Sequence, residues 1–531
     1  MTPPIAPPRP PTRKDLGDFQ TPPGLVAQVL AALGPTIGGR FPRVLEPTCG
    51  RGHFLAGLLG RPDPPREIRG FEIQPAYAEA ARSVAAAHPG VRLVVEAADA
   101  FRVDFGRDVP WVEPGPLLVV GNLPWVTAAG LGASGGLNGP GRSNVRRLRG
   151  IDAMTGESNF DISEALWLKL IRELAPERPT IALLCKSAVA RAVLRGIEAA
   201  DLPVTSATLW RVDAHRWFGA SVDACLFRVE VGPGPKATEA PVYAHLAAAG
   251  PESSLGLGRG ALIADVDAHR RSAFADGSCP IAWRQGIKHD AADVMELAHG
   301  PDGRPRNKRG EVVDVEDEYV YPLLKGADLA GPARPRPRRS VLVPQRRLGE
   351  DTRDLARTAP RLWAYLVAHA ADFERRKSSI YRGRPPFALF GVGDYSFAPF
   401  KVAISGLHKS PRFRAIGPIR GRPAMLDDTG YSLPCRSAEQ AATLAAALNG
   451  PESLDLLRGL VFRDAKRPIT KAVLRRVDIE ALLARAEPIA LRERAGAGWR
   501  EMDDPGGPPP ESWPLTWKAD WASPPAPTPR A

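Results

Sequence analysis

The sequence predicts an α/β domain with a largely parallel sheet, followed by an α+β domain. Short apolar runs alternate with amphipathic helical stretches from Phe19 to about Glu230, which is the pattern of strands and crossover helices. A Gly- and Pro-rich stretch at 232–239, GPGPKATE, has the composition of a linker. Beyond it the apolar spacing becomes irregular and the chain turns basic. The 531 residues suffice for two or more domains of roughly 100 to 200 residues each.

Each predicted strand is a short run of aliphatic residues, and each predicted helix spaces its apolar residues three or four apart. In chain order, we expect strands at 43–45, 68–72, 92–96, 117–121, 181–186, 206–211 and 224–231. We expect helices at 23–33, 54–59, 76–86, 163–174 and 188–198, and in the second domain at 361–377, 438–448 and 470–484. The predicted organisation is a flexible arm at 1–16, a first domain at 17–232, a second at 240–486 and a Pro-rich tail at 487–531.

The positive charge of the chain is concentrated in one segment. The net charge is +12, and residues 331–420 alone hold 19 Lys and Arg against 6 Asp and Glu. A localised basic surface of this size commonly binds phosphate. The alternative is a coding bias toward Arg, Ala, Pro and Gly, which is visible along the whole chain.

The composition disfavours membrane, secreted and zinc-binding proteins. No stretch approaches the roughly 18 consecutive apolar residues of a membrane helix, and the Pro-rich start lacks the apolar core of a signal peptide. We therefore expect a cytoplasmic protein. The five cysteines lie far apart without a CxxC pair, which indicates neither a disulfide framework nor a zinc site. We expect buried thiols and no metal.

A turn after the first predicted strand has the residues of a cofactor loop. It reads Glu46-Pro-Thr-Cys-Gly50-Arg-Gly52, and its glycines let the backbone approach a ligand while the next helix offers free amides. The following strand ends in Glu72, where a carboxylate can accept both ribose hydroxyls of a nucleoside. Asp99 follows the third strand, in a place to meet an adenine edge. The alternative is a tight turn beside solvated acids.

The acid before this turn distinguishes between nucleoside cofactors. The complete G-x-G-x-x-G of dinucleotide folds is absent, and Glu46 would repel a pyrophosphate. The sulfonium and amino groups of S-adenosylmethionine suit an acid here. The turn therefore indicates S-adenosylmethionine as the cofactor.

The fourth predicted strand runs into Asn122-Leu123-Pro124-Trp125. The Asn122 amide and a main-chain carbonyl on a Pro-stiffened turn can accept two hydrogen bonds from one amino group, and Trp125 can stack on the base that carries it. Such acceptors draw the nitrogen toward tetrahedral geometry and direct its lone pair at a sulfonium methyl, which is catalysis by orientation. An Asn-x-Pro-Trp turn is also common by chance, so the motif depends on its context.

Taken in order, the opening Phe19-Gln-Thr-Pro22, the glycine turn and this fourth-strand turn resemble the motifs of N6-adenine DNA amino-methyltransferases of the Eco57I-like restriction–modification type. The resemblance covers about residues 17–230. It implies a Rossmann-like class I S-adenosylmethionine-dependent methyltransferase sheet, with a target-recognition domain after it. It departs at Leu123, where the family usually has proline. The position contributes a backbone carbonyl, which leucine still supplies, but the turn loses rigidity.

The resemblance implies a role for each matching residue. The implied cofactor-binding residues are Thr21, Pro22, Glu46, Gly50, Gly52, Glu72 and Asp99. The implied catalytic residues are Asn122, Leu123, Pro124 and Trp125. A further block at 159–162 resembles the family segment that lines the cleft, although Asp161 equally suits a helix N-cap. Asn122 favours adenine over cytosine N4, because the cytosine enzymes of the family more often carry serine there.

Duplex DNA is the partner that the resemblance and the basic segment imply. The loop at 127–156 is rich in Gly, Ser and Arg, and we interpret it as a clamp on DNA phosphate, with a solvated insertion as the alternative. Two strings of the second domain, 283–289 and 391–402, resemble Eco57I-like recognition domains more loosely. The candidate DNA contacts are Arg146, Arg147, Lys288, Arg382, Arg384, Lys401, Lys409 and Arg412.

The predicted function is methyl transfer from S-adenosylmethionine to adenine N6 in duplex DNA after base flipping, as the modification component of a restriction–modification or phage-defence system. A separately encoded restriction endonuclease is a candidate partner, because the sequence holds no persuasive nuclease constellation. Two alternatives stay open. One is an RNA or protein amide methyltransferase that shares the same turn, and the other is a DNA-binding homologue with impaired catalysis.

Overall fold

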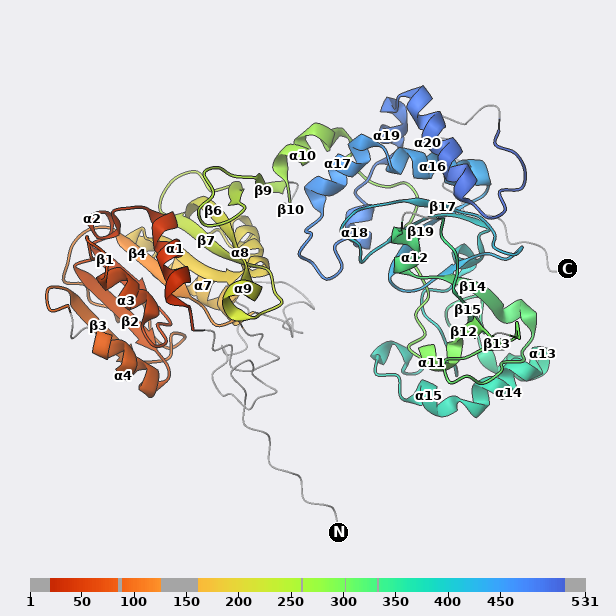
Figure 1. The fold of residues 1–531 in the computed structure, drawn as a ribbon, viewed down its shortest axis with the longest axis horizontal. Helices are drawn as coiled ribbons and strands as arrows, with labels where there is room; N and C mark the ends of the chain where they lie inside the picture. The colour runs from red at the N-terminus through yellow and green to blue at the C-terminus, as the bar shows by residue number, and fades with distance from the viewer. Residues whose placement is uncertain are drawn as a thin grey trace, which may run out of the picture. The chain divides into compact units, whose positions relative to one another are not determined.

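The computed structural model describes residues 20–84, 88–125, 161–258, 261–300, 302–331 and 334–510. The chain divides into two units, Met1–Val266 and Asp267–Ala531 (Figure 1). The predicted arm at 1–16 and the predicted DNA contacts Arg146 and Arg147 lie outside the described residues.

Unit 1 is built on a ten-stranded sheet with the order β10-β9-β8-β6-β7-β5-β4-β1-β2-β3. Strands β3, β2, β1, β4 and β5 are parallel to one another, and β7 is inserted antiparallel between β5 and β6. This is the mixed α/β sheet of class I S-adenosylmethionine-dependent methyltransferases, so the predicted fold class is confirmed. Its strands are β1 (Arg43–Glu46), β2 (Glu67–Glu72), β3 (Arg92–Ala97), β4 (Leu117–Asn122), β5 (Thr180–Lys186), β6 (Val204–Val212), β7 (Ala224–Val231), β8 (Glu239–Tyr243), β9 (Ser253–Gly258) and β10 (Ala261–Ile263).

Helices cover both faces of this sheet because its central strands are apolar on both sides. On one face, α1, α3 and α4 pack against alternate residues such as Val44, Ile68 and Val120. On the other face, Trp167 of α7 packs on Phe227 of β7, with ring centroids 5.1 Å apart. The helices of unit 1 are α1 (Pro23–Leu33), α2 (Ile37–Arg40), α3 (His53–Leu59), α4 (Pro75–Ser83), α7 (Ile162–Glu173), α8 (Ser187–Ala199) and α9 (Ala214–Phe218).

The first unit extends further along the chain than the composition indicates. The Gly- and Pro-rich stretch at 232–239 lies between β7 and β8, and β8 then pairs parallel to β6 through Leu209↔Val242. Strands β9 and β10 continue the same sheet. The structural boundary therefore falls at Val266, because the stretch that resembles a linker is a loop within one sheet.

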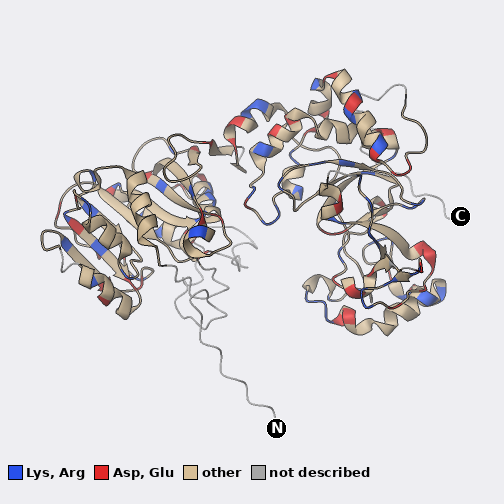
Figure 2. Cartoon of the chain, in the orientation of Figure 1, with Lys and Arg blue, Asp and Glu red and all other residues tan. Residues whose placement is uncertain are grey.

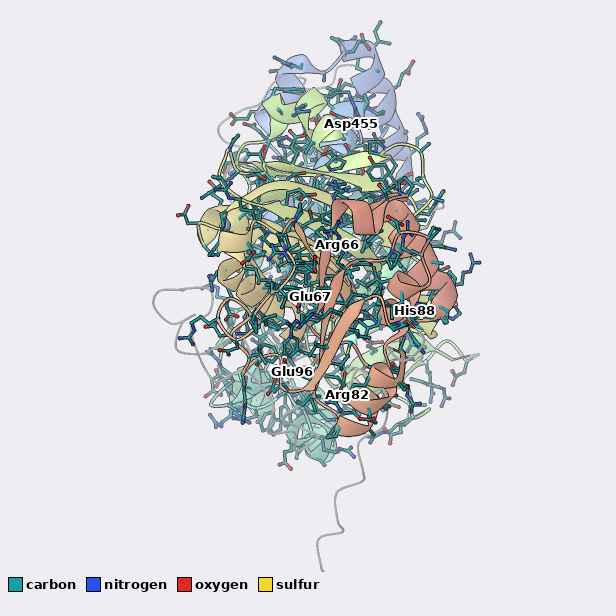
Figure 3. All side chains as sticks on the ribbon, turned by 90° about the vertical axis from the view of Figure 1, so that its left-hand side faces the viewer. Arg66, Glu67, Arg82, His88, Glu96 and Asp455 are labelled. Carbon is teal, nitrogen blue, oxygen red and sulfur yellow. The ribbon has the colours of Figure 1, made fainter. Side chains whose placement is uncertain are left out.

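The base of strand β2 is fixed by a buried acid. Glu67, labelled in Figure 3, pairs with Arg69 at 2.7 Å and accepts hydrogen bonds from the amides of Val112 and Glu113. Burial alone would raise the pKa of Glu67, but these amides and the Arg69 guanidinium outweigh it and lower the pKa. The long connection after β3 is thereby held against the end of the sheet opposite the carboxyl ends of its parallel strands.

Unit 2 contains two smaller sheets. One has the order β11-β19-β16-β17 and the other β13-β12-β15-β14-β18. Its strands are β11 (Arg284–Gln285), β12 (Glu296–His299), β13 (Pro305–Arg306), β14 (Val320–Leu324), β15 (Arg339–Leu342), β16 (Phe400–Ser405), β17 (Arg414–Ile416), β18 (Met425–Leu426) and β19 (Gly430–Cys435). Its helices are α10 (Val266–Ser272), α11 (Ala292–Met295), α12 (Gly326–Ala330), α13 (Leu355–Thr358), α14 (Pro360–Ala368), α15 (Ala370–Glu374), α16 (Ala438–Leu448), α17 (Pro451–Leu460), α18 (Lys471–Leu474), α19 (Ile479–Arg485) and α20 (Pro488–Glu501).

Three features of unit 2 differ from the sequence prediction. The helix expected at 361–377 is interrupted at His369 between α14 and α15, and the one expected at 470–484 is divided into α18 and α19. The predicted tail at 487–531 begins with α20, which buries Leu491, Ala495 and Trp499 at a spacing of four residues. The helix was not predicted because the Pro-rich segment that follows it led us to assign the whole region to a tail.

Within the described ranges, no helix has the length and apolarity that crossing a bilayer requires. The same part of the chain holds no group of three or more His, Cys, Asp and Glu side chains with a metal-site arrangement.

Candidate active site

The glycine turn between β1 and α3 has a backbone that only glycine adopts easily. Gly50 has φ +53° and Gly52 has φ +82°, both in the left-handed region. A Cβ on Gly52 would lie 3.0 Å from the Ala81 Cα, so the turn also packs against α4. The turn therefore packs closely against α4, and the Gly50 amide reaches the Glu72 carboxylate at the carboxyl end of β2.

The chain just before α1 is tied to this turn. The Gln20 side-chain oxygen accepts a hydrogen bond from the Arg51 amide at 3.2 Å. The His53 Nδ1 atom lies 2.8 Å from the Thr21 carbonyl oxygen. The opening motif and the glycine turn, distant in sequence, thus form one wall of a cavity.

Two acids face this cavity with different hydrogen bonding. The Glu72 carboxylate accepts hydrogen bonds from the amides of Gly50 at 2.9 Å and Gln74 at 2.7 Å. Glu46 is 2% exposed, and its Oε2 atom is buried without a hydrogen-bond donor among the described residues. Burial, together with the nearby Glu72, raises the pKa of Glu46 well above its ordinary value. A positively charged ligand at this point would reverse that effect.

The thiol beside these acids is structural. Cys49 is buried, and a Cβ on Gly70 would lie 3.2 Å from its sulfur atom. Burial, with the negative charges of Glu46 and Glu72, raises the pKa of the Cys49 thiol far above its usual range. Cys49 therefore packs in the turn as a neutral thiol, which is the less nucleophilic form.

The residues Asn122, Leu123 and Pro124, here called the amine turn, lie at the carboxyl end of β4, whose last residue is Asn122. Strand β4 pairs in register with β5, and the Leu123 amide donates to the Leu184 carbonyl at 3.3 Å. Gly121 before the turn has φ +154°, and a Cβ there would lie 3.2 Å from the Glu46 Cγ. The small residue lets the buried acid and the amine turn approach each other.

One cavity contains most of the residues predicted for cofactor binding and catalysis. Of these, its lining includes Thr21, Glu46, Gly50, Glu72, Asn122, Leu123 and Pro124. The lining residues to which the sequence assigned no role are Gln20, Thr48, Cys49, His53, Phe54, Ile73, Gln74 and Tyr77.

Two of these additional lining residues could have been found from the sequence. The signal in the sequence for Ile73 is its position directly after Glu72, the acid that ends β2. In the structure it is 44% exposed, which is unusual for isoleucine. Tyr77 is one helical turn further on, with the Arg51 guanidinium 4.7 Å from its ring centroid. Together they give this side of the cavity an apolar surface against which a flat ring can pack.

Four predicted site residues lie outside the lining. Pro22 and Gly52 border it in sequence only. Asp99 accepts a hydrogen bond from the Phe101 amide at 2.9 Å and pairs loosely with Arg102 at 3.8 Å. Trp125 is 6% exposed and packs edge-on against Phe218, with ring centroids 4.9 Å apart. In this conformation the indole is a core residue, so stacking on a base requires it to turn away from Phe218.

The predicted DNA contact Lys401 requires correction. Its side chain is 2% exposed, and the ammonium group donates to the Ala398 carbonyl at 2.6 Å. Burial lowers the pKa of Lys401 to about 7. A side chain enclosed in β16 cannot reach a phosphate. Phe400 and Val402, on either side of Lys401, are apolar. From the sequence we expect one buried and one exposed face, but both faces of β16 are buried.

The other basic residues of unit 2 vary in exposure. Arg382, Arg384 and Lys409 are exposed. Lys288 pairs with Asp290 at 3.5 Å, and Arg412 pairs with Glu501 at 3.4 Å. Figure 2 shows acidic residues interspersed among the basic ones in both units.

Part of the basic excess at 331–420 is internal to the fold. Arg414 is fully buried, pairs with Glu501 at 2.7 Å and donates to the Leu329 carbonyl. Arg334 pairs with Asp503 at 2.7 Å. Acids outside the segment therefore neutralise some of its charge, and the basic surface is smaller than the count of residues indicates.

A curated relative covers nearly the whole chain. The type II methyltransferase M.NspV of Nostoc sp. (strain ATCC 29411 / PCC 7524) is 36% identical over 476 residues, which are 89% of this chain and 98% of the relative. The chain belongs to the type II methyltransferase family. It is therefore a DNA methyltransferase of a restriction–modification system, with S-adenosylmethionine as its cofactor. No family model matches the sequence.

Two solved structures are similar to this type II methyltransferase at low sequence identity. The type IIL restriction–modification enzyme MmeI, solved in complex with DNA, is 12% identical with a TM-score of 0.48; the match covers 85% of this chain and 64% of MmeI. A modification subunit of a putative type I restriction enzyme from Vibrio vulnificus YJ016 is 16% identical with a TM-score of 0.29, covering 44% of this chain and 48% of the subunit. Neither likeness bears on which base is methylated.

Proposed function

We propose that this type II methyltransferase transfers a methyl group to the N6 amino group of adenine in a short duplex sequence. The observation that carries the proposal is that the amine turn opens into the same cavity as Glu46, Glu72 and Gly50. The proposed acceptor for an amino group and the proposed loop for a nucleoside cofactor therefore line one cavity, as direct transfer between two bound groups requires.

The cavity residues fit S-adenosylmethionine. The buried Glu46 Oε2 atom has no donor among the described residues, so a cationic amino group could donate to it, and a nearby sulfonium would favour its charged form. Glu72 would hold the ribose hydroxyls, Ile73 and Tyr77 would pack on the adenine ring, and Thr21, Pro22, Gly50 and Gly52 would enclose the methionine part. Asp99 is assigned to the adenine amino edge. When bound, the cofactor supplies an electrophilic methyl group.

In the proposed mechanism the amine turn orients the target nitrogen. The Asn122 side-chain oxygen and the Leu123 carbonyl each accept one N–H of the amino group, and Pro124 stiffens the chain between them and Trp125. Both acceptors bias the nitrogen toward a tetrahedral arrangement, with its lone pair toward the methyl group. The chain provides orientation, and the excess proton leaves to solvent after transfer. Trp125, released from Phe218, would stack on the flipped base.

The assignment of adenine rests on the side chain at position 122. An asparagine amide offers an acceptor in the plane of the base, whereas the related cytosine enzymes more often carry serine at this position. The cofactor loop does not discriminate between the two bases. We therefore attribute the base preference of this chain to the amine turn alone.

We assign target recognition to unit 2. Its two strings that resemble recognition domains lie side by side, because Lys288 and Phe390 exchange backbone hydrogen bonds at 2.8 and 2.9 Å. Gly286 and Gly391 meet at the same place, where a Cβ on Gly391 would lie 2.3 Å from the Gly286 carbonyl oxygen. The exposed Arg382, Arg384 and Lys409 are candidates for phosphate contacts. A separately encoded endonuclease would complete the restriction–modification pair.

Sequencing of genomic DNA with detection of modified bases tests the proposal. Cells that express the protein should carry N6-methyladenine at one short sequence motif, and cells that express an Asn122→Ala variant should not. Methylated cytosine without methylated adenine would contradict the assignment to adenine. The absence of any methylated base at the sites that a cognate nuclease cuts would contradict it as well.

A further inference from the structure

The amine turn is held by hydrogen bonds on both sides of Leu123. Before it, the Thr48 hydroxyl donates to the Asn122 carbonyl at 3.2 Å. After it, the Ser163 hydroxyl donates to the Pro124 carbonyl at 2.6 Å. Neither bond uses the Leu123 carbonyl oxygen, which is the acceptor assigned to the target amine. We call Thr48 and Ser163 the hydroxyl clamp.

The Ser163 hydroxyl is itself fixed. Ser163 is completely buried in the first turn of α7, and its amide donates to the Asp161 carboxylate at 3.0 Å. The other oxygen of Asp161 accepts from the Lys186 ammonium at 2.8 Å. Lys186 ends β5, which pairs in register with the strand that carries the amine turn. The start of α7 and the amine turn are therefore anchored to neighbouring strands.

The Thr48 hydroxyl is anchored from the opposite side. Thr48 precedes the glycine turn, and the amide of the next residue, Cys49, donates to the Phe71 carbonyl at 2.8 Å. Thr48 also lines the cavity. Its hydrogen bond thus joins the cofactor loop to the amine turn. The segment proposed to hold the cofactor and the segment proposed to hold the target amine are therefore directly linked.

We propose that the hydroxyl clamp supplies the restraint that a proline ring would supply at position 123. A proline ring fixes its own φ and limits the residue before it, whereas the φ of Leu123 is restrained only by packing and by the 3.3 Å hydrogen bond from its amide to the Leu184 carbonyl. The Leu123 carbonyl must stay within a narrow range to meet the amino group, since a displacement of about 1 Å can cost on the order of a hundredfold in rate. Fixing the carbonyls on both sides restricts the rotation of Leu123 further. Thr48 and Ser163 are accordingly positioning residues, and this inference rests on the proposed role of the amine turn.

A double-mutant cycle with Leu123→Pro tests the clamp. In the full chain, Thr48→Val and Ser163→Ala should each reduce the single-turnover rate about three- to tenfold, the size of one missing hydrogen bond. The S-adenosylmethionine Kd should stay within about twofold. In the Leu123→Pro background the same substitutions should cost less than about twofold, because the ring already restrains the turn. Equal losses in both backgrounds would overturn the proposal, as would no loss in either.

Matched variants distinguish the effect of losing a hydrogen bond of the clamp from the effect of losing a hydroxyl group elsewhere in the chain. Thr205→Val removes a hydroxyl that donates to the Glu230 carbonyl at 3.3 Å, and Ser272→Ala removes one that donates to the Ala268 carbonyl at 2.9 Å. Both should leave the rate unchanged. Should Leu123→Pro fail to fold, Thr48→Ser decides: it keeps the hydroxyl and should restore the rate that Thr48→Val loses. A Thr48→Ser variant as slow as Thr48→Val would refute the clamp.

A second readout distinguishes this inference from the proposed function. Amide deuterium exchange of the peptide that contains the amine turn should accelerate in Thr48→Val and in Ser163→Ala and stay unchanged in Thr205→Val. Nucleoside analysis of the product identifies the base methylated by the unaltered chain. If the methylated nucleoside is deoxycytidine, the adenine assignment is wrong, but the double-mutant cycle still tests the clamp. If it is deoxyadenosine and the effects of the substitutions are additive in the cycle, only the clamp proposal is wrong.

Discussion

The chemistry of the cavity depends on which carboxyl oxygens already have donors. Glu72 receives two backbone amides, so its position is fixed before any ligand arrives. Glu46 has a buried oxygen atom without a donor in the described part of the chain, next to another acid. The ligand-free protein therefore holds Glu46 in its protonated form to a higher pH than an ordinary glutamate. A cationic ligand beside it would favour its ionised form.

We expect the binding of S-adenosylmethionine to release a proton from Glu46. Affinity should then rise as pH rises toward the elevated pKa of Glu46, and the Glu46→Gln variant should lose this dependence. Calorimetry in buffers of different ionisation enthalpy measures the released proton. Identical proton release by both proteins would assign the effect to another group.

The same carboxyl group should affect stability in the ligand-free protein. A raised pKa means that the folded state binds more protons than the unfolded state, so this group destabilises the fold progressively as pH rises above about 4.5. Glu46→Gln should therefore raise the Tm at pH 8 and have little effect near pH 4. A Tm difference that is the same at both pH values would indicate a packing effect instead.

Asn122 provides the second test at this scale. Asn122→Ala removes the side-chain acceptor of the target amine, and we expect a loss on the order of a hundredfold or more in the single-turnover rate, by analogy with removal of a catalytic hydrogen-bonding group. Cofactor affinity should be unchanged within about twofold, because the assigned cofactor-binding residues belong to other elements. A nearly normal rate would remove Asn122 from the mechanism.

At the scale of elements, the glycine turn connects stability with function. Gly52 has φ +82°, and the Ala81 Cα lies 3.0 Å from the place that a Cβ would occupy, whereas Gly219 at the end of α9 has φ +65° and open space around it. Both positions strain a residue with a side chain, but only Gly52 would also displace α4. The comparison separates conformational strain from the packing that shapes the cofactor loop.

Gly219→Ala should lower the free energy of unfolding by about 1 kcal/mol, and Gly52→Ala should lower it by more. Only Gly52→Ala should weaken the binding of S-adenosylmethionine, because only that turn adjoins the cavity. Chemical denaturation and calorimetric titration measure the two quantities. Equal effects of both variants on stability and affinity would show that α4 does not depend on its packing against Gly52.

The elements that could be predicted are those with strong local patterns. Aliphatic runs locate the seven strands from β1 to β7. The central strand β4 is buried on both faces and needs apolar residues almost throughout, whereas the edge strand β3 is largely exposed and has only a short apolar run. Strand β9, with the sequence SSLGLG, was missed because it lies toward the edge of the sheet and has few apolar residues. In the site, Glu46 and Asn122 stand out through their motifs. Thr48 and Ser163 do not, because a hydroxyl gains its role only from the carbonyl that the fold brings to it.

At the scale of the whole molecule, the basic excess is divided between internal ion pairs and exposed side chains. Arg414 is part of the core of unit 2, whereas Arg382 and Arg384 are exposed and precede the string at 391–402. Counting charges along the sequence therefore overstates the surface that is open to phosphate. The exposed pair is the part of the excess that can be tested on DNA.

Reversing the charge of Arg382 and Arg384 to glutamate should weaken binding to cognate and random duplexes alike. The slope of log affinity against log salt should become shallower by about 0.9 for each phosphate that the protein no longer neutralises. Arg66→Glu with Arg270→Glu is the control, since it changes the net charge equally at two other exposed positions. Equal weakening by both pairs would show a general effect of net charge and no local binding of phosphate.

The amine turn of this type II methyltransferase is proposed to direct a methyl group to adenine N6, and the identity of the methylated nucleoside tests this most directly. The full chain is incubated with duplex DNA and S-adenosylmethionine carrying a deuterated methyl group, and the digested nucleosides are measured by mass spectrometry. We expect deuterated N6-methyldeoxyadenosine as the product, reduced on the order of a hundredfold or more by Asn122→Ala. Deuterated N4-methyldeoxycytidine, or a label that stays on the protein, would contradict it.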